Sequence, residues 1–176
     1  IVVVDNNSGD GVGELLKEKY PSVRFIPQDT NPGFGTSQNV GLNSVDAKYY
    51  FALNPDTEFF SGQKTIRRLY DFMEDNKKIG MVGPKIRYPD GSLQYSCWRF
   101  PSILQPFYNR TKLGKTSRGE KKRGYHLMND FDHDYTIPVD ALMGSAMFVR
   151  GVALKQVGGF DERFWMYYED IDWCLR

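Results

Sequence analysis

The sequence predicts an α/β fold built on a mostly parallel sheet that is flanked by helices. Short apolar strands alternate with segments of helical periodicity over residues 1–82, which is the pattern of consecutive βαβ units. The opening strand, residues 1–4, is a β-branched run without polar alternation, as expected for a strand that is covered on both faces. We therefore expect right-handed crossovers and ligand binding beyond the carboxyl ends of the strands.

The elements after the opening strand follow from turn residues and helical spacing. Turn and cap residues over 5–11 end the first strand, and the helix that follows closes at Pro21. Residues 23–26 form a second short strand. A loop over residues 31–35 then leads into a helix that runs from 36 to about 42.

A third strand, residues 49–53, breaks abruptly at the turn Asn54-Pro55-Asp56. The next helix has one face marked by Ile66, Leu69, Tyr70 and Met73. A fourth strand begins at Met81. These lengths complete the alternation of strands and helices on which the predicted fold rests.

Regularity fades after the turn at residues 89–91, and residues 98–135 form a loop-rich, variable insertion. It holds a basic run made of Arg110, Lys112, Lys115, Arg118, Lys121, Lys122 and Arg123. A solvated loop is the favoured interpretation, and contact with anionic lipid headgroups or nucleic acid is the alternative. Order returns at residues 137–139 and 146–149, and an aromatic segment covers 164–168.

The composition indicates one ordinary globular domain. Of its 176 residues 40% are hydrophobic, and 23 basic against 22 acidic residues leave a net charge of +1, so charge names no partner. No apolar run reaches the ~20 residues that span a bilayer. Cys97 and Cys174 are far apart in the sequence and lack the spacing of metal ligands, and this cysteine usage favours a reducing compartment. Because the chain opens directly in a strand and stops within a helical pattern, we expect a fragment of a domain.

Acidic and amide side chains follow two of the predicted strands. Asp5 comes directly after the first strand, where its carboxylate could accept hydrogen bonds from a base or ribose, or could serve as a turn residue or helix cap. Asn54 and Asp56 stand at alternate positions after the third strand. Oxygen ligands at this spacing suit a magnesium or manganese ion that also binds phosphate, and an ordinary turn is the alternative.

A third acidic position follows the aromatic segment. Glu169 and Asp170 could place a general base near a bound hydroxyl, or could simply open a helix whose dipole favours acids. The aromatic residues before them could bind a sugar ring or belong to the core. The run that holds Asp130, Asp132 and Asp134 also has metal-binding side chains, but it lies in the irregular segment and a solvated acidic loop is favoured.

Several of these motifs occur together and in a fixed order. They are Val2-Val3-Val4-Asp5-Asn6-Asn7-Ser8, Asn31-Pro32-Gly33-Phe34-Gly35 with Asn39-Val40-Gly41-Leu42, Leu53-Asn54-Pro55-Asp56-Thr57, Gly144-Ser145-Ala146, and Gly158-Gly159-Phe160-Asp161-Glu162 through Glu169-Asp170-Ile171-Asp172. In this succession the chain resembles the family 2 glycosyltransferases, especially the bacterial rhamnosyltransferase-like branch that builds cell-surface polysaccharides. The resemblance covers nearly the whole chain outside the insertion.

The resemblance implies a role for each motif. Asp5 corresponds to the acid that contacts the base or ribose, Asp56 to the metal-binding acid of the DxD motif, and Asp170 to the catalytic base of the ED motif. Asn54 replaces the first DxD acid. The remaining residues assigned to the nucleotide-sugar donor are Asn7, Asn31, Gly33, Phe34, Asn39 and Asn54, and those assigned to the acceptor are Gly144, Ser145, Trp165 and Glu169.

The resemblance also implies a Rossmann-like GT-A fold, of which the chain lacks the usual first strand and the region after the ED motif. Within the single domain, residues 1–90 would bind the nucleotide sugar and residues 136–176 would hold the acceptor and the catalytic base. The implied activity is inverting transfer of a sugar from a nucleotide-diphosphate donor to a glycan or lipid-linked hydroxyl, with Mn²⁺ or Mg²⁺ as cofactor.

Two other functions share these features. A sugar nucleotidyltransferase would be expected to show a Gly-rich phosphate loop near its start, and none is visible. A non-catalytic nucleotide-sugar-binding domain would need Asp5 and Asp56 but not Asp170. The family implies a cytoplasmic protein at the inner face of the cell membrane, with peripheral contact through the basic insertion and without a nucleic-acid partner.

Overall fold

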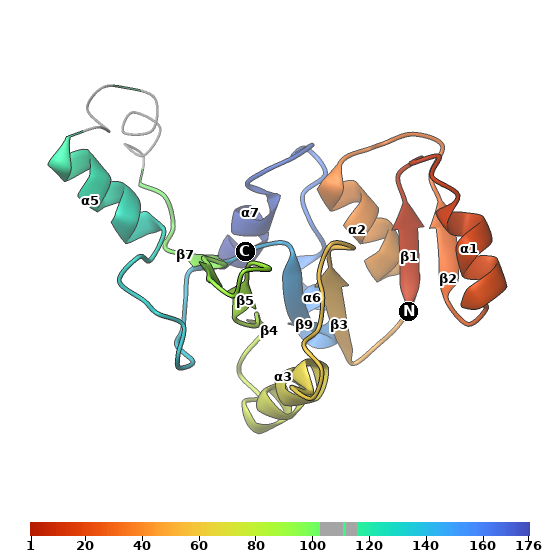
Figure 1. Cartoon of the computed structure of the whole chain (residues 1–176), viewed down its shortest axis with the longest axis horizontal. Coiled ribbons are helices and arrows are strands. Elements are labelled where there is room, and N and C mark those ends of the chain that lie inside the picture. Colours follow the sequence, from red (N-terminus) through yellow and green to blue (C-terminus); the bar gives the residue numbers. More distant parts are fainter. Residues whose placement is uncertain (103–110, 112–115) are drawn as a thin grey trace.

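The computed structural model describes residues 1–102, 111 and 116–176 (Figure 1). Its first unit is the expected βαβ arrangement. Strand β1 (Val2–Asp5) pairs in parallel with β2 (Arg24–Pro27), and α1 (Val12–Lys19) connects them. Helix α2 (Phe34–Asn43) follows and contacts both β1 and β3 (Tyr49–Leu53). The first three predicted strands and two helices are therefore present, with bounds that differ by one or two residues.

The central sheet differs from the predicted one in strand direction. Its order is β3-β9-β4, and β9 (Ala146–Arg150) runs antiparallel to both β3 and β4 (Met81–Val82). The prediction of an α/β fold is confirmed, but a mostly parallel sheet is wrong for these pairs. The strand direction was mispredicted because β9 is buried along most of its length. A buried apolar run has the same sequence pattern in a parallel and in an antiparallel sheet.

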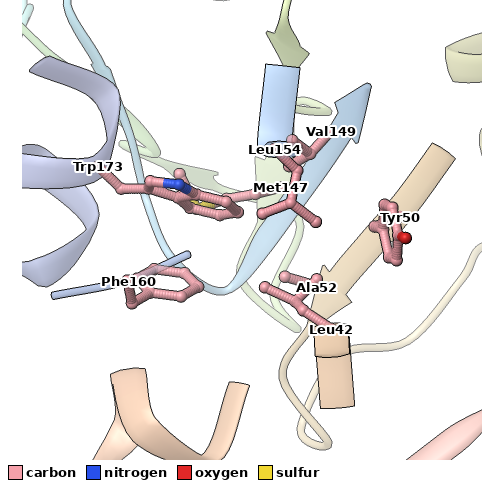
Figure 2. Packing of buried hydrophobic residues seen from close by; sticks show 8 residues of the cluster. All are labelled: Leu42, Tyr50, Ala52, Met147, Val149, Leu154, Phe160 and Trp173. Carbon is pink, nitrogen blue, oxygen red and sulfur yellow. The ribbon is translucent and has the colours of Figure 1, made fainter. Parts of the chain in front are cut away.

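Two helical layers cover the central sheet. On one face, residues of α2, α6 (Gly151–Val157) and α7 (Glu169–Leu175) join the sheet in the main core, where Figure 2 shows Trp173 beside Met147. On the other face, Leu69 and Met73 of α3 (Thr65–Asp75) pack on Phe148. Side chains from before and after the insertion thus build one core.

Short strands bring the ends of the insertion together. β5 (Ile86–Arg87) and β6 (Leu93–Gln94) form a hairpin, and β7 (Cys97–Trp98) pairs with β8 (Ala141–Leu142). The insertion contains a helix that the sequence analysis did not anticipate, α5 (Ser117–His126). Of its basic residues, Arg110, Lys112 and Lys115 lie outside the described residues, as do the side chains of Arg118, Lys122 and Arg123. Across the described residues, no helix has the length and apolar character needed to cross a bilayer.

Candidate active site

The site lies beyond the ends of β1 and β3, which point in the same direction in Figure 1. At the end of β1, the Asp5 carboxylate accepts a 3.2 Å hydrogen bond from the Ser8 amide, which closes the following turn. Asn7 has a left-handed backbone with φ of 61°, and its side-chain amide donates to the Asp29 carbonyl at 3.1 Å. These contacts hold Asp5 and Asn7 at the loop between β1 and α1 and tie that loop to the end of β2.

The loop before α2 is organised by Asn31 and Gly33. The Asn31 side-chain oxygen accepts a 3.0 Å hydrogen bond from the Gly33 amide. Gly33 has φ of 96°, and a Cβ there would lie 2.4 Å from the Trp165 carbonyl oxygen. The same carbonyl accepts a 3.2 Å hydrogen bond from the Phe34 amide. Residues 31–35, the donor loop of the nucleotide-sugar site that the resemblance implies, therefore meet the aromatic segment at a position that only glycine fits.

Ser37, which the sequence analysis did not single out, links this loop to β1. Its hydroxyl lies within hydrogen-bonding distance of the Asn6 side-chain oxygen, at 2.5 Å, and of the Gly33 carbonyl, at 2.9 Å. Ser37 stands one helical turn after Gly33, so helical spacing was the only sequence signal available for it.

Asn39 has a structural role that the sequence analysis did not foresee. Its side chain is buried, donates to the Phe160 carbonyl and the Glu162 carboxylate at 2.9 Å each, and accepts from the Phe160 amide at 2.8 Å. These bonds occupy both ends of the amide and tie α2 to the loop before the aromatic segment. We therefore assign Asn39 to positioning this loop and leave it out of the proposed donor site.

The turn after β3 presents Asp56 to solvent. Thr57 closes the turn by donating from its hydroxyl to the Asn54 carbonyl at 2.8 Å, and Asp56 at its tip is exposed. The Asn54 side-chain oxygen is buried and has no hydrogen-bond partner among the described residues. A free carboxylate and an unpaired amide oxygen are hard oxygen donors, so this turn fits a divalent cation that completes its coordination with diphosphate oxygens.

Asp170 opens α7 and also contacts a distant segment. Its carboxylate accepts hydrogen bonds from the Gly144 amide at 3.0 Å and the Ile171 amide at 2.8 Å. Burial raises the pKa of Asp170, and the two backbone hydrogen bonds oppose that rise. A Cβ built on Gly144 would lie 3.1 Å from the Phe34 ring and 3.5 Å from the Asp170 Cβ, so these three residues are neighbours.

Glu169 and the aromatic segment differ sharply in exposure. Glu169 is only 6% exposed, and burial followed by the Asp170 charge raises its pKa. Trp165 and Tyr167 are 58% and 73% exposed, so the aromatic segment lies on the surface and the core alternative is wrong for them. Tyr167 and Tyr168 both have left-handed backbones, with φ of 70° and 71°, immediately before α7.

The acidic run of the insertion is engaged in ion pairs. Asp130 makes a bidentate pair with Arg99 at 2.9 Å, and Asp134 pairs with Lys85 at 2.5 Å. Within the described part of the chain, no group of three or more histidine, cysteine and acidic side chains is placed to hold a metal. The solvated-loop interpretation of Asp130 and Asp134 therefore fits better than a second metal site.

The comparisons with known proteins identify the family to which the chain belongs. The profile of Glycosyl transferase family 2 matches residues 1–143, and the chain belongs to that family. It is 33% identical to an N-acetylglucosaminyl-diphospho-decaprenol L-rhamnosyltransferase of Mycobacterium tuberculosis, over 98% of the chain and 58% of the relative. It is 28% identical to the rhamnosyltransferase WbbL of Escherichia coli, over 99% of the chain and 65% of the relative. It therefore spans little more than half the length of the first of these.

Solved structures show the GT-A fold. A mannosyltransferase from Pyrobaculum calidifontis, solved in complex with GDP-Man and Mn²⁺, aligns with a TM-score of 0.58 at 16% identity, over 98% of this chain and 40% of that one. Staphylococcus aureus TarS 1-349 in complex with UDP aligns with a TM-score of 0.56 at 17% identity, over 98% of this chain and 44% of that one.

Proposed function

We propose that the protein containing this chain is an inverting glycosyltransferase that moves a sugar from a nucleotide-diphosphate donor to a hydroxyl of a glycan or lipid-linked acceptor in cell-surface polysaccharide synthesis. The observation that carries the proposal is the Gly144–Asp170 hydrogen bond, which holds a partly buried carboxylate beside Phe34 at the end of the donor loop. Family membership and the rhamnosyltransferase relatives support the same activity.

In the proposed reaction, Asp170 takes the proton of the acceptor hydroxyl as that oxygen attacks the anomeric carbon. The new glycosidic bond forms while the bond from the anomeric carbon to the diphosphate breaks, and the nucleoside diphosphate leaves with the electron pair. The two backbone hydrogen bonds fix the orientation of the Asp170 carboxylate before the acceptor arrives. Such fixed geometry is what general base catalysis requires.

Asp56 would hold the divalent cation, Mn²⁺ or Mg²⁺, at the turn after β3. The cation would neutralise charge that develops on the departing diphosphate. Asp5, Asn7 and Asn31 would contact the nucleotide, because their loops lie at the same edge of the strands.

Trp165 and Gly144 would bind the acceptor. Trp165 is exposed, its carbonyl is anchored on the Phe34 amide, and Phe34 in turn lies against Gly144 and Asp170. The exposed ring of Trp165 offers a flat apolar face, which suits the face of a sugar. On the basis of the family relationship, we further propose that the enzyme acts at the cytoplasmic face of the membrane.

Nucleotide binding tests the proposal. UDP, dTDP and GDP, each with and without Mn²⁺, are added to the full-length wild type, to Asp56→Ala, and to the control Asp46→Ala, and the thermal midpoint is measured. Asp46 is exposed and pairs with Lys155. It lies before the start of β3, at the opposite end of this strand from Asp56. A ligand at 100 times its Kd adds about 2.7 kcal/mol of stability.

We expect one nucleotide to stabilise the wild type and the Asp46 control in a Mn²⁺-dependent way, and Asp56→Ala to lose that dependence. Absence of any nucleotide effect on the full-length wild type would contradict the proposal. A non-catalytic binding domain would give the same shifts but no turnover that depends on Asp170.

A further inference from the structure

The net charge of +1 conceals an uneven distribution of charge along the chain. Residues 110–123 hold seven of the 23 basic residues and one of the 22 acidic residues. The rest of the chain therefore holds 16 basic against 21 acidic residues, and it is negative where this run is strongly positive. An anionic partner would orient such a protein, because the run is attracted to it and the remainder is repelled.

Helix α5 arranges the end of this basic run on one face. Its ten residues include four basic residues against one acidic residue. Helical spacing places positions 118, 121, 122 and 125 on the same face, because residues three and four apart are neighbours on a helix. Lys121 and Tyr125 are exposed, whereas Gly119 is buried. The face that holds the four positions is therefore turned towards solvent.

Apolar side chains are exposed beside the end of α5. The Arg99 amide donates to the His126 carbonyl at 3.0 Å, which joins the segment after β7 to the last residue of the helix. The residues next to this bond are Phe100, Tyr125 and Leu127, and they are 37%, 64% and 38% exposed. Large apolar side chains beside lysine and arginine are typical of helices that lie in a membrane interface.

Arg99 fixes the position of the Tyr125 ring. Its guanidinium lies 4.2 Å from the centroid of the ring, donates to the Tyr125 carbonyl at 2.7 Å and forms the bidentate pair with Asp130. The ring is thus exposed and held in place at the same time. It can bind a surface with little loss of conformational freedom, and tyrosine is a residue that favours the headgroup level of a membrane.

The place of α5 in the fold suits a contact on the acceptor side. Figure 1 shows α5 outside the central sheet, on the side of α7 and at the opposite end of the molecule from α1. The chain before and after α5 meets where β7 pairs with β8, and β8 in turn contacts α7. The helix is therefore attached to the half of the chain that is proposed to hold the acceptor.

We propose that the exposed face of α5, together with Phe100 and Leu127, docks the protein on an anionic membrane surface. The basic residues would lie at the lipid phosphates, and the apolar side chains would enter the boundary between headgroups and acyl chains. This inference rests on the proposed function, since a lipid-linked acceptor lies in the membrane. A nucleic acid would also attract the basic residues, but its phosphate backbone would offer no apolar environment to Leu127.

Vesicle binding tests this docking surface. The full-length protein is sedimented with vesicles of phosphatidylcholine alone and with vesicles of an equal mixture of phosphatidylcholine and phosphatidylglycerol, and the partition coefficient is measured. Lys121→Glu is compared with the control Lys78→Glu, an equal change of charge at an exposed residue after α3. Leu127→Ser is compared with Leu15→Ser, which changes a leucine of α1 that is 44% exposed.

We expect the wild type to prefer the mixed vesicles, with binding that weakens as the salt concentration rises. Each charge near an anionic surface contributes a factor of about 5, so Lys121→Glu, a change of two charges, should weaken binding about 25-fold. Leu127→Ser should weaken it about 2- to 10-fold. Both controls should bind as the wild type does, because their positions are remote from α5 and salt screens distant charges.

Equal binding of the wild type to both kinds of vesicle would overturn the proposal, and so would an equal loss in Lys121→Glu and Lys78→Glu. Binding of a single-stranded oligonucleotide with the vesicles left unbound would also overturn it and would assign the surface to nucleic acid. The nucleotide-dependent thermal shift is measured on the same samples and shows that each variant is folded. A preserved shift without vesicle binding refutes the docking surface alone, whereas the absence of any shift in the wild type contradicts the proposed function.

Discussion

The Gly144 amide donates a 3.0 Å hydrogen bond to Asp170 Oδ2, and this contact joins the segment before β9 to the first turn of α7. It explains how an acid in the first turn of a helix can also be oriented for catalysis. Asp170 is oriented by a residue outside its own helix, while its neighbour Glu169 points into the core.

The pH dependence of turnover should report Asp170. A general base works when ionised, and burial raises the pKa of Asp170 above the ordinary 3.8, so kcat should fall on acidification at a pH above that value. Burial and then the neighbouring Asp170 charge also raise the pKa of Glu169, so the two carboxyl groups interact and the acid limb belongs to the pair. Comparing kcat profiles of wild type and Glu169→Gln separates them; an acid limb centred below 3.8 in both would contradict the assignment.

Asn39→Ala should destabilise the fold rather than abolish a nucleotide contact. It leaves the Phe160 amide and carbonyl without their buried partner, and each such loss costs about 1–3 kcal/mol. Urea unfolding measures the effect, with Gln38→Ala on the same helix as the control. Wild-type stability combined with weakened nucleotide binding would return Asn39 to the donor site.

Gly33→Ala should separate the donor loop from the aromatic segment. A Cβ there would lie 2.4 Å from the Trp165 carbonyl oxygen and would also be strained by the positive φ of 96°. Gly62 has a comparable positive φ of 81°, but a Cβ on it would have nothing within 4 Å. Strain from φ alone costs on the order of 1–3 kcal/mol, so Gly33→Ala should lose more stability than Gly62→Ala. Equal unfolding midpoints in the two variants would show that the close approach does not hold in solution.

Local patterns predicted most of the elements. β3 matches the predicted strand 49–53 and ends directly before Asn54, while the functional roles of the site residues stay predictions. The antiparallel course of β9 escaped prediction because its partners are about 65 to 100 residues earlier in the chain, and a buried apolar run does not encode direction. The side-chain hydrogen bonds of Asn39 were not predicted for the same reason, because their partner Phe160 is 121 residues away in the sequence.

The central claim is that Asp170 is the general base, and turnover of Asp170→Asn tests it most directly. Asp172→Asn on the same helix is the matched control, because Asp172 pairs with Arg176 at 2.8 Å and takes no part in the proposed reaction. In the full-length enzyme we expect Asp170→Asn to lose about 10²- to 10⁴-fold in kcat with its donor Kd unchanged, and Asp172→Asn to retain activity. Wild-type turnover in Asp170→Asn would contradict the account.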